Sequence, residues 1–195
     1  MPDDGVHDGR VRCAWAGSEP EYTRYHDEEW GRPVRGVTAM FERLSLEGFQ
    51  SGLSWIVILR KRPAFRAAFA GFVPEEVARF DDADVERLLG DAGIVRNRSK
   101  IAATISNARA VLDLDTPLDD LLWSFAPASH VPPATFADVP ATTPESVAMA
   151  KELKRRGLRF VGPTTCYALM QAVGLVDDHV AECWRSAPQR EPWAD

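Results

Sequence analysis

The sequence lacks any hydrophobic run long enough to cross a membrane. Its longest strictly apolar stretches cover about five residues, as in the segment 55–59, whereas a spanning helix needs roughly 20. It also lacks the basic and then apolar start that marks a secretion signal. Its three cysteines cannot form a closed set of disulfides. Together these absences predict a cytoplasmic protein that has no membrane partner.

An excess of positive charge is also missing. The formal net charge is −6 at pH 7, so any nucleic acid would have to contact local basic patches rather than the protein as a whole. Hydrophobic residues make up 45% of the 195 residues, which suffices for a packed core and excludes disorder over the whole chain. We expect a monomer with one domain over residues 11–185, a flexible arm over 1–10 and a tail over 186–195.

No segment shows the two-residue alternation of a β-strand, and helical spacing dominates instead. For example, Val37, Met40, Phe41 and Leu44 form one apolar stripe at three- and four-residue intervals. The sequence therefore predicts an all-α protein of about nine short helices. Capping residues and prolines mark the expected helix starts, which are Ser54 before Trp55, Pro63, Pro74, Asp82, Ser99, Pro117, Thr143 before Pro144, and Pro163.

Glu47 interrupts the apolar stripe. It follows Leu44 by three residues, so a helix that continues past Leu44 places the Glu47 carboxyl group on the buried face. A buried carboxylate is unfavourable unless it is paired or hydrogen-bonded. The residues 48–54 are mostly small or polar, which indicates a helix that ends at a cleft. The alternative is that Glu47 only caps the helix or pairs locally.

Aromatic residues are concentrated near the start of the chain. Trp15, Tyr22, Tyr25 and Trp30 fall within 16 residues, ahead of the first strongly helical segment. Such clusters usually pack in a core, because Trp and Tyr are large hydrophobic residues. The functional interpretation is a stacking pocket for a planar ligand such as a nucleobase.

Two pairs of potential metal ligands lie near opposite ends of the chain. His179 and Cys183 are four residues apart, so on a helix they would share one face. Cys13 and His26 lie near the start, and two Cys with two His can form a tetrahedral zinc site. The alternative is a buried free cysteine and a surface histidine. His130 has no partner that the sequence reveals.

Three short basic clusters lie at 60–66, 96–100 and 151–159. Two predicted helices flank Gly162 after the last cluster, in the layout of a helix-hairpin-helix motif. The start of the second helix offers free backbone N–H groups to a phosphate, so Gly162 and Thr164 are candidate DNA-binding residues. The alternative is that the basic runs only cover solvated helix faces, since 29 acidic residues outnumber 23 basic ones.

A set of motifs follows one order from about Arg12 to Cys183, nearly the whole chain. The motifs are Cys-Ala-Trp at 13–15, Tyr22-x-x-Tyr25-His26-Asp27-x-x-Trp30-Gly31, Leu46-Glu47-Gly48, Gly52-Leu53-Ser54-Trp55, Asp91-Ala92-Gly93-Ile94, Phe160-Val161-Gly162 and Asp178-His179-x-x-x-Cys183. Together they resemble the DNA-3-methyladenine glycosylase I family. Each motif alone is weak, but the set is highly specific.

The resemblance implies an enzyme that removes 3-methyladenine from alkylated double-stranded DNA, with a helix-hairpin-helix fold and one structural zinc ion. It places the zinc ligands on Cys13, His26, His179 and Cys183, and the base pocket on Glu47, Tyr25, Trp55 and Trp15, with Tyr22 and Trp30 nearby. It also places Gly52 and Leu53 where the duplex is plugged after the damaged base leaves the stack. An ionised Glu47 would then favour a cationic purine. No lysine follows Gly162, so the enzyme is expected to hydrolyse the base without a lyase step.

The sequence departs from the family pattern in a few places. Phe49 stands where a polar residue is expected, Asp177 stands in place of an asparagine, and the arm before Cys13 is long. We interpret Asp178 as a helix cap or as a group that supports the metal ligand beside it. Two other functions stay open, namely a DNA-binding module without catalysis and an enzyme for another alkylated or deaminated base.

Overall fold

The computed structural model describes residues 8–186, and within that range every regular element is a helix. The predicted arm and tail lie mostly outside the described residues. The elements are η1 (Ala14–Ala16), α1 (Pro20–Glu28), α2 (Val37–Gln50), α3 (Trp55–Ala68), η2 (Ala70–Phe72), α4 (Pro74–Val77), α5 (Asp82–Gly90), α6 (Arg98–Leu112), α7 (Leu118–Trp123), η3 (Phe136–Asp138), α8 (Pro144–Arg155) and α9 (Pro163–Ala172). The all-α prediction of about nine short helices is confirmed.

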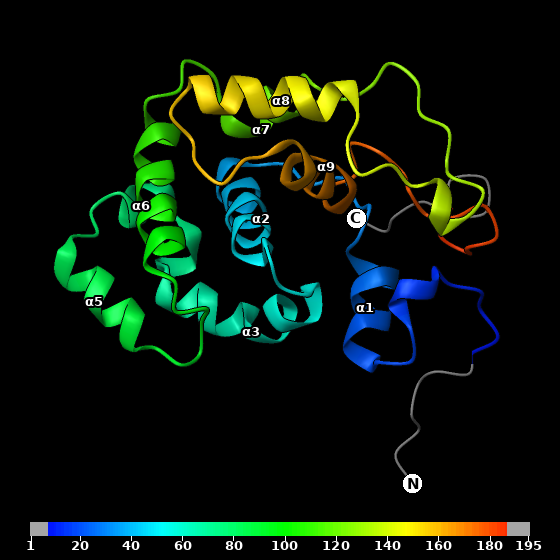
Figure 1. Cartoon of the computed structure of the whole chain (residues 1–195), viewed down its shortest axis with the longest axis horizontal. Coiled ribbons are helices and arrows are strands. Elements are labelled where there is room, and N and C mark those ends of the chain that lie inside the picture. Colours follow the sequence, from blue (N-terminus) through cyan, green and yellow to red (C-terminus); the bar gives the residue numbers. More distant parts are fainter. Residues whose placement is uncertain (1–7, 187–195) are drawn as a thin grey trace, which may run out of the picture.

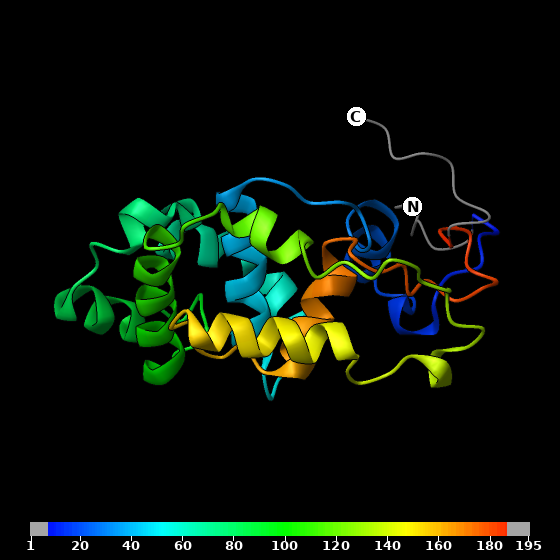
Figure 2. The same cartoon turned by 90° about the horizontal axis from the view of Figure 1, so that it is seen from above.

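The central element is α2, which packs against α3, α6, α7 and α9 (Figure 1). Met40, Phe41 and Leu44 of its apolar stripe are buried, as their spacing predicts, and Val37 at the start of the helix is partly buried. Viewed from above, α8 lies along one side of the molecule and α9 runs from beside it toward the middle, while α1 lies toward the end that holds both described termini (Figure 2). The main core thus surrounds α2 and leaves the carboxyl end of that helix near α1 and α9.

The predicted helix starts need three corrections, and α1, which begins at Pro20 and carries Tyr22 and Tyr25, was not predicted. Pro63 does not begin a helix, because α3 runs through it; burial of Ile58 and Phe65 on either side outweighs the roughly 3 kcal/mol cost of an internal proline. The N-cap of α5 is Asp81 rather than Asp82, since its side chain accepts hydrogen bonds from the N–H groups of residues 83 and 84. The N-cap of α6 is Asn97, whose side chain accepts from the N–H of residue 100.

A second, smaller apolar cluster joins the two ends of the chain. Its buried members are Cys13, Tyr25, Trp30, Leu59, Ala172 and Cys183. Trp55 at the start of α3 packs against this cluster and against the main core as well. The N-terminal aromatic segment is therefore held beside the ends of α2 and α9.

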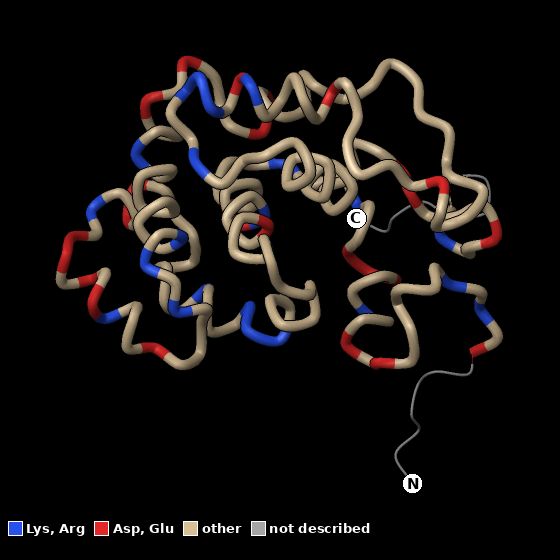
Figure 3. The backbone as a smooth tube through the Cα atoms, viewed as in Figure 1, with Lys and Arg blue, Asp and Glu red and all other residues tan. Residues whose placement is uncertain are grey.

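Charges of both signs are spread over the backbone (Figure 3). Within residues 8–186, no helix combines the length and apolar character needed to cross a bilayer. Many predicted basic residues have acidic partners, for example Arg60 with Glu19 and Arg66 with Glu42. These basic clusters are partly neutralised, as the solvated-face alternative expects.

Candidate active site and metal centre

A cavity of about 380 Å³ opens where α1, α2, α3 and α9 meet. Its size suits one small planar ligand. The lining residues are Trp15, Tyr22, Tyr25, Trp30, Glu47, Gln50, Ser54, Trp55, Phe136, Val139, Ala168, Gln171 and Asp178. All six side chains predicted for the base pocket therefore line one cavity.

Glu47 is the most unusual residue of this cavity. It lies in the last turn of α2 with only 5% of its surface exposed, and its Oε2 atom has no hydrogen-bond partner among the described residues. Burial raises the pKa of Glu47 to about 8, against a smaller lowering by the positive charge of Arg43. In the protein without a ligand, this raised pKa favours the neutral carboxyl group near pH 7, whereas the predicted ionised form concerns the protein with a cationic base bound. The local-pairing alternative is not observed.

Aromatic rings form the walls beside Glu47. The ring centroids of Tyr25 and Trp55 lie 5.3 Å apart, and those of Trp15 and Trp30 lie 5.0 Å apart. The indole nitrogen of Trp55 is buried without a partner, so the cavity holds one unpaired donor and one unpaired acid. Tyr22 has a structural task as well, because its hydroxyl accepts a 2.9 Å hydrogen bond from the backbone N–H of Ile56.

The turn between α2 and α3 carries two of the predicted DNA-binding residues. Gly52 has φ of +81°, a conformation that favours glycine, and Leu53 is 41% exposed. Lys100 on α6 holds this turn, because its ammonium group donates to the carbonyl oxygens of Phe49 at 2.8 Å and Ser51 at 2.5 Å. Lys100 is buried, so its assignment to a basic surface cluster is wrong.

Helices α8 and α9 pack against each other across a short connection. Gly157 and Phe160 in this connection have φ of +85° and +56°. Asn107 on α6 fixes it with two hydrogen bonds to the backbone of Arg159, at 3.0 and 2.7 Å. Gly162 is the N-cap of α9, and Thr164 is exposed in its first turn. Both predicted contact residues thus lie at the start of the second helix.

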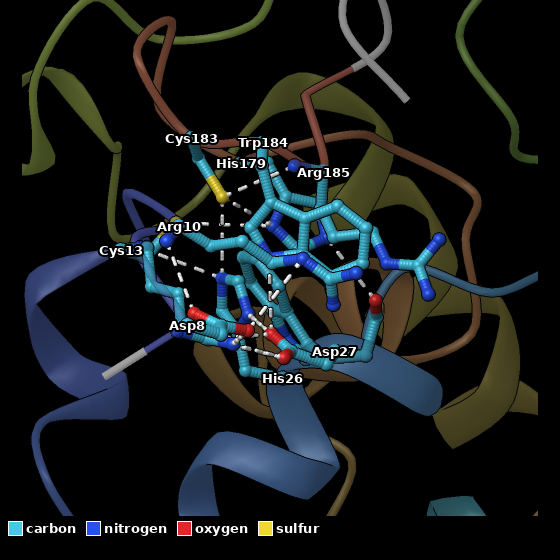
Figure 4. Close-up of polar contacts among 11 residues, drawn as sticks. Asp8, Arg10, Cys13, His26, Asp27, His179, Cys183, Trp184 and Arg185 are labelled. Atoms are coloured by element: carbon cyan, nitrogen blue, oxygen red, sulfur yellow. Dashed lines mark hydrogen bonds and ion pairs between the residues drawn. The ribbon is translucent and has the colours of Figure 1, made fainter. Parts of the chain in front are cut away.

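Four potential metal ligands from the two ends of the chain converge (Figure 4). Cys13, His26, His179 and Cys183 are buried, and their ligand atoms lie within 4.8 Å of one another. Cys183 Sγ lies 3.4 Å from His26 Nε2 and 3.6 Å from His179 Nδ1, and Cys13 Sγ lies 3.8 Å from His179 Nδ1. Tetrahedral Zn–S bonds of about 2.3 Å and Zn–N bonds of about 2.1 Å require roughly such separations. The residues therefore fit a metal ion with four protein ligands.

The remaining nitrogen of each imidazole also has a partner. His26 Nδ1 lies 2.8 Å from the Asp27 carboxylate, and His179 Nε2 lies 3.2 Å from the carbonyl oxygen of Trp30. Asp27 accepts further hydrogen bonds from Arg12 at 2.7 Å and from the indole N–H of Trp184 at 3.2 Å. Such partners orient histidine ligands and leave the other ring nitrogen free for a metal.

The segment that supplies two of these ligands is not a helix, although the four-residue spacing of His179 and Cys183 suggested one. Residues 177–180 have no regular structure and residues 181–186 form turns and bends, in which the N–H of Cys183 bonds to the carbonyl oxygen of Val180 at 2.8 Å. The two side chains converge because the backbone bends around the site. Spacing alone therefore indicated the right pair with the wrong local structure.

Asp178 and His130 are partners, which sequence reasoning missed. His130 Nε2 lies 3.0 Å from Asp178 Oδ1. The other carboxylate oxygen accepts hydrogen bonds from the Tyr167 hydroxyl at 2.6 Å and the Gln171 amide at 2.7 Å. Asp178 follows α9 and begins no helix, so of its two predicted roles the helix cap is wrong. Its partners are Tyr167, Gln171 and His130 rather than a potential metal ligand. Its carboxylate instead orients polar side chains at the cavity wall.

Several lining residues had not been predicted. Phe136 and Val139 come from the proline-rich connection between α7 and α8, where no periodic signal marks them. Gln171 could have been found, because it is the only amide or charged residue between Cys166 and Leu175 in an otherwise mostly apolar helix. Phe49 does not line the cavity; it packs on Phe65 at 4.7 Å in the core. The departure at position 49 thus leaves the cavity wall unchanged.

Comparison with known proteins agrees with this arrangement. Residues 15–186 match the sequence profile of the methyladenine glycosylase family. DNA-3-methyladenine glycosylase 1 of Escherichia coli (strain K12) is 49% identical over 179 residues, which cover 88% of this chain and 95% of that protein. A crystal structure of 3-methyladenine DNA glycosylase I has a TM-score of 0.87 and 46% identity, and the match covers 90% of this chain and 100% of that one.

A further solved structure shows a variant of 3-methyladenine DNA glycosylase I in complex with 3-methyladenine. It has a TM-score of 0.85 and 31% identity, and the match covers 92% of this chain and 98% of that one. The family profile covers nearly all the described residues, including every residue that lines the cavity and three of the four potential metal ligands, and begins two residues after Cys13. This chain therefore belongs to the methyladenine glycosylase family.

Proposed function

We propose that the protein hydrolyses the N-glycosidic bond of 3-methyladenine in alkylated double-stranded DNA. The observation that carries this proposal is the buried Glu47 carboxyl group, which lies unpaired in a cavity walled by Trp55 and Tyr25. Family membership supports the same activity, because relatives of this chain are 3-methyladenine glycosylases. As in those relatives, the substrate is a damaged base within DNA.

The cavity is suited to a positively charged purine. Methylation at N3 makes the base in DNA a cation, and a cation stacks favourably on aromatic faces such as those of Trp55 and Tyr25. The same charge lowers the pKa of Glu47 from about 8, so the carboxyl group ionises as the base enters. The carboxylate then accepts hydrogen bonds from the adenine edge and gains the partner that it lacks in the free protein.

Normal adenine is rejected by the same arrangement. With a neutral purine bound, Glu47 either stays protonated or becomes a buried carboxylate without a positively charged partner. A buried polar group without a partner makes the free energy of binding less favourable. The protein therefore selects a charge that only the damaged base carries. Extraction of that base from the duplex costs a few kcal/mol, and less for a damaged base than for a paired one.

The reaction itself needs little help, because the cationic base is already a good leaving group. The bond between the sugar C1′ and the base nitrogen breaks, and its electron pair leaves with the base, which becomes neutral. Water adds to C1′ and releases one proton to solvent. No lysine follows Gly162, so the proposal contains no lyase step.

Two surfaces are proposed to bind the duplex around the cavity. The exposed Leu53 at the Gly52 turn fills the space that the extracted nucleotide leaves in the helix. The α8–α9 connection acts as a helix-hairpin-helix, in which Gly162 and Thr164 offer backbone and hydroxyl groups to a phosphate. The net charge of −6 predicts few phosphate contacts and binding that weakens with salt.

We further propose that the four-ligand group holds one zinc ion with a structural role. When bound, the ion ties the N-terminal aromatic segment to the C-terminal turn, and four protein ligands leave no position for a reactive water. Cys13 and His26 keep Trp15 and Tyr25 at the cavity through this tie. The buried, free thiols of all three cysteines support a reducing, cytoplasmic setting, and we expect a monomer.

The test is release of free base from methylated duplex DNA, resolved by chromatography. We expect the protein to release 3-methyladenine and Glu47→Gln to release it at least about a hundredfold more slowly, since a buried charge partner is lost. Glu42→Gln on the same helix is the matched control, because Glu42 pairs with Arg66 outside the cavity. No released base from the unmodified protein, together with DNA binding that survives Glu47→Gln, would favour a non-catalytic DNA-binding module.

A further inference from the structure

We infer that Gln171 is a specificity-determining residue: its amide oxygen accepts a hydrogen bond from the exocyclic amine of the bound purine and disfavours a purine with a carbonyl oxygen there. The inference rests on the proposed function and deepens it, because Glu47 selects the charge of the base whereas Gln171 would select its hydrogen-bonding edge. Such a role requires that the oxygen of the Gln171 amide, and not its nitrogen, faces the cavity.

Asp178 decides that orientation. Its side chain is 1% exposed, and its two carboxylate oxygens only accept hydrogen bonds. One of these oxygens accepts from two donors, the Tyr167 hydroxyl at 2.6 Å and the Gln171 amide nitrogen at 2.7 Å. His130 Nε2 lies 3.0 Å from the other oxygen and also 3.0 Å from the carbonyl oxygen of Asp177. The amide must present its NH₂ group to this carboxylate, because its oxygen would face another acceptor.

The amide oxygen of Gln171 consequently points away from Asp178 and has no hydrogen-bond partner among the described residues. Gln171 lines the cavity together with Ala168, three residues earlier on the same face of α9. A half-buried amide oxygen without a partner, held in one orientation by a buried carboxylate, is an acceptor prepared for a ligand.

The chemistry of the two purines makes this acceptor selective. Adenine carries an amine donor at position 6, whereas guanine carries the acceptor O6 at the same place. An amide oxygen accepts a hydrogen bond from the adenine amine, whereas it repels guanine O6, which is also an acceptor. The cationic charge of 3-methyladenine and 3-methylguanine is the same, so Glu47 alone does not separate them, and a second polar group is needed.

The experiment uses duplex DNA that contains both methylated bases and measures the release of each in one reaction. Because both products come from the same enzyme molecules, their ratio does not depend on how much of a variant is folded. We expect Gln171→Met to lower the ratio of 3-methyladenine to 3-methylguanine release by about tenfold or more, the effect of one lost hydrogen bond and one removed repulsion. Asp178→Ala, which frees the amide to rotate, should lower the ratio by less.

Tyr167→Phe is the matched control, because it removes one donor to Asp178 and keeps the Gln171–Asp178 hydrogen bond. It should keep the ratio of the unmodified protein. An unchanged ratio in Gln171→Met overturns the inference and leaves the proposed function intact, whereas an unmodified protein that releases neither base overturns both. If Gln171→Met does not fold, Gln171→Leu is tested for binding of free 3-methyladenine against 3-methylhypoxanthine, and an unchanged preference again rejects the inference.

Discussion

Arg43 lies one helical turn before Glu47 on α2, yet its guanidinium group leaves the Glu47 carboxyl oxygen Oε2 unpartnered. The guanidinium is turned to Glu29 instead, to which its Nη2 donates at 3.1 Å. Glu29 in turn accepts two hydrogen bonds from Arg62 at 2.5 and 2.7 Å. Arg43 is thus joined through Nη2 to a structural ion cluster, its Nη1 is buried without a hydrogen-bond partner, and the acid in the cavity stays available for a ligand.

The first prediction concerns the stability of the protein at different pH values. The pKa of Glu47 is about 8 in the folded protein against 4.5 for an unperturbed glutamate, so the folded state keeps a proton that the unfolded state loses. Stability contributed by this group therefore falls as the pH rises from 4.5 to 8. We expect Glu47→Gln to match the unmodified protein near pH 4 and to exceed it by roughly 2–4 kcal/mol at pH 8.

Urea denaturation at both pH values measures this difference. Glu42→Gln controls for the loss of one acidic residue from α2. A Glu47→Gln variant that is no more stable at pH 8 than the unmodified protein would show that the carboxyl group is solvated or paired in solution.

The second prediction concerns the ion cluster of Glu29. Arg62 and Arg43 lower the pKa of the Glu29 carboxyl group to about 2, although burial alone would raise it. A lowered folded-state pKa gives stability that is present above about pH 4.5 and is lost as the pH falls toward 2. Glu29→Gln should cost about 3 kcal/mol at pH 7, because it leaves the buried Arg62 without its counter-ion.

The same variant should cost much less at pH 3, which distinguishes an electrostatic effect from lost packing. Glu76→Gln removes an exposed ion pair with Arg79 and should change stability by less than about 1 kcal/mol. Equal destabilisation by Glu29→Gln at pH 7 and pH 3 would rule out an electrostatic origin.

The sequence allowed the helices and the chemistry-bearing residues to be predicted, because both depend on local patterns. A helix is set by residues only a few positions apart, as in the stripe from Val37 to Leu44 and at the helix starts marked by Pro144 and Pro163. Pro63 was placed wrongly because tertiary packing around Phe65 overrides a local preference. At Glu47 the local pattern did not decide between a helix cap or local pair and a residue that faces a cleft. Only the resemblance to a family predicted that Glu47 lies in a base pocket.

What sequence reasoning missed depends on contacts between distant residues. Lys100 lies in a basic run, but it binds carbonyl groups about 50 positions earlier. The partners of Asp178 include His130 from a connection without any periodic signal. Hydrogen bonds of this kind are set by the final packing of helices, so no spacing rule along the chain could have predicted them.

The third prediction concerns Lys100 and the turn that it holds. Lys100→Met leaves the carbonyl oxygens of Phe49 and Ser51 without their donor, which should cost about 2 kcal/mol of stability. The loosened turn should also slow base release from duplex DNA. Lys151→Met, which changes an exposed lysine on α8, is the control for both measurements. If base release by Lys100→Met equals that of the control, the turn needs no such support.

The fourth prediction separates a role in DNA binding from a role in folding. Leu53 is 41% exposed, so Leu53→Ala should change the free energy of unfolding by less than about 1 kcal/mol. If the side chain fills the gap left by the extracted nucleotide, the variant should release 3-methyladenine about tenfold more slowly from duplex DNA. Val131→Ala, at a residue that is 84% exposed on another loop, should be neutral in both respects. Normal release by Leu53→Ala would remove Leu53 from the mechanism.

The last prediction concerns the metal. Elemental analysis of the purified protein should find one zinc ion per chain, and Cys13→Ser should reduce this content and lower the melting temperature. Cys166→Ser is the matched control, because Cys166 is buried near Val161 and lies outside the ligand group, so its zinc content should stay at one. Activity should fall together with stability after chelation, since the proposed ion would hold Trp15 and Tyr25 at the cavity without contacting the base. A chelated protein that keeps its melting temperature would show that the four ligands need no metal to stay in place.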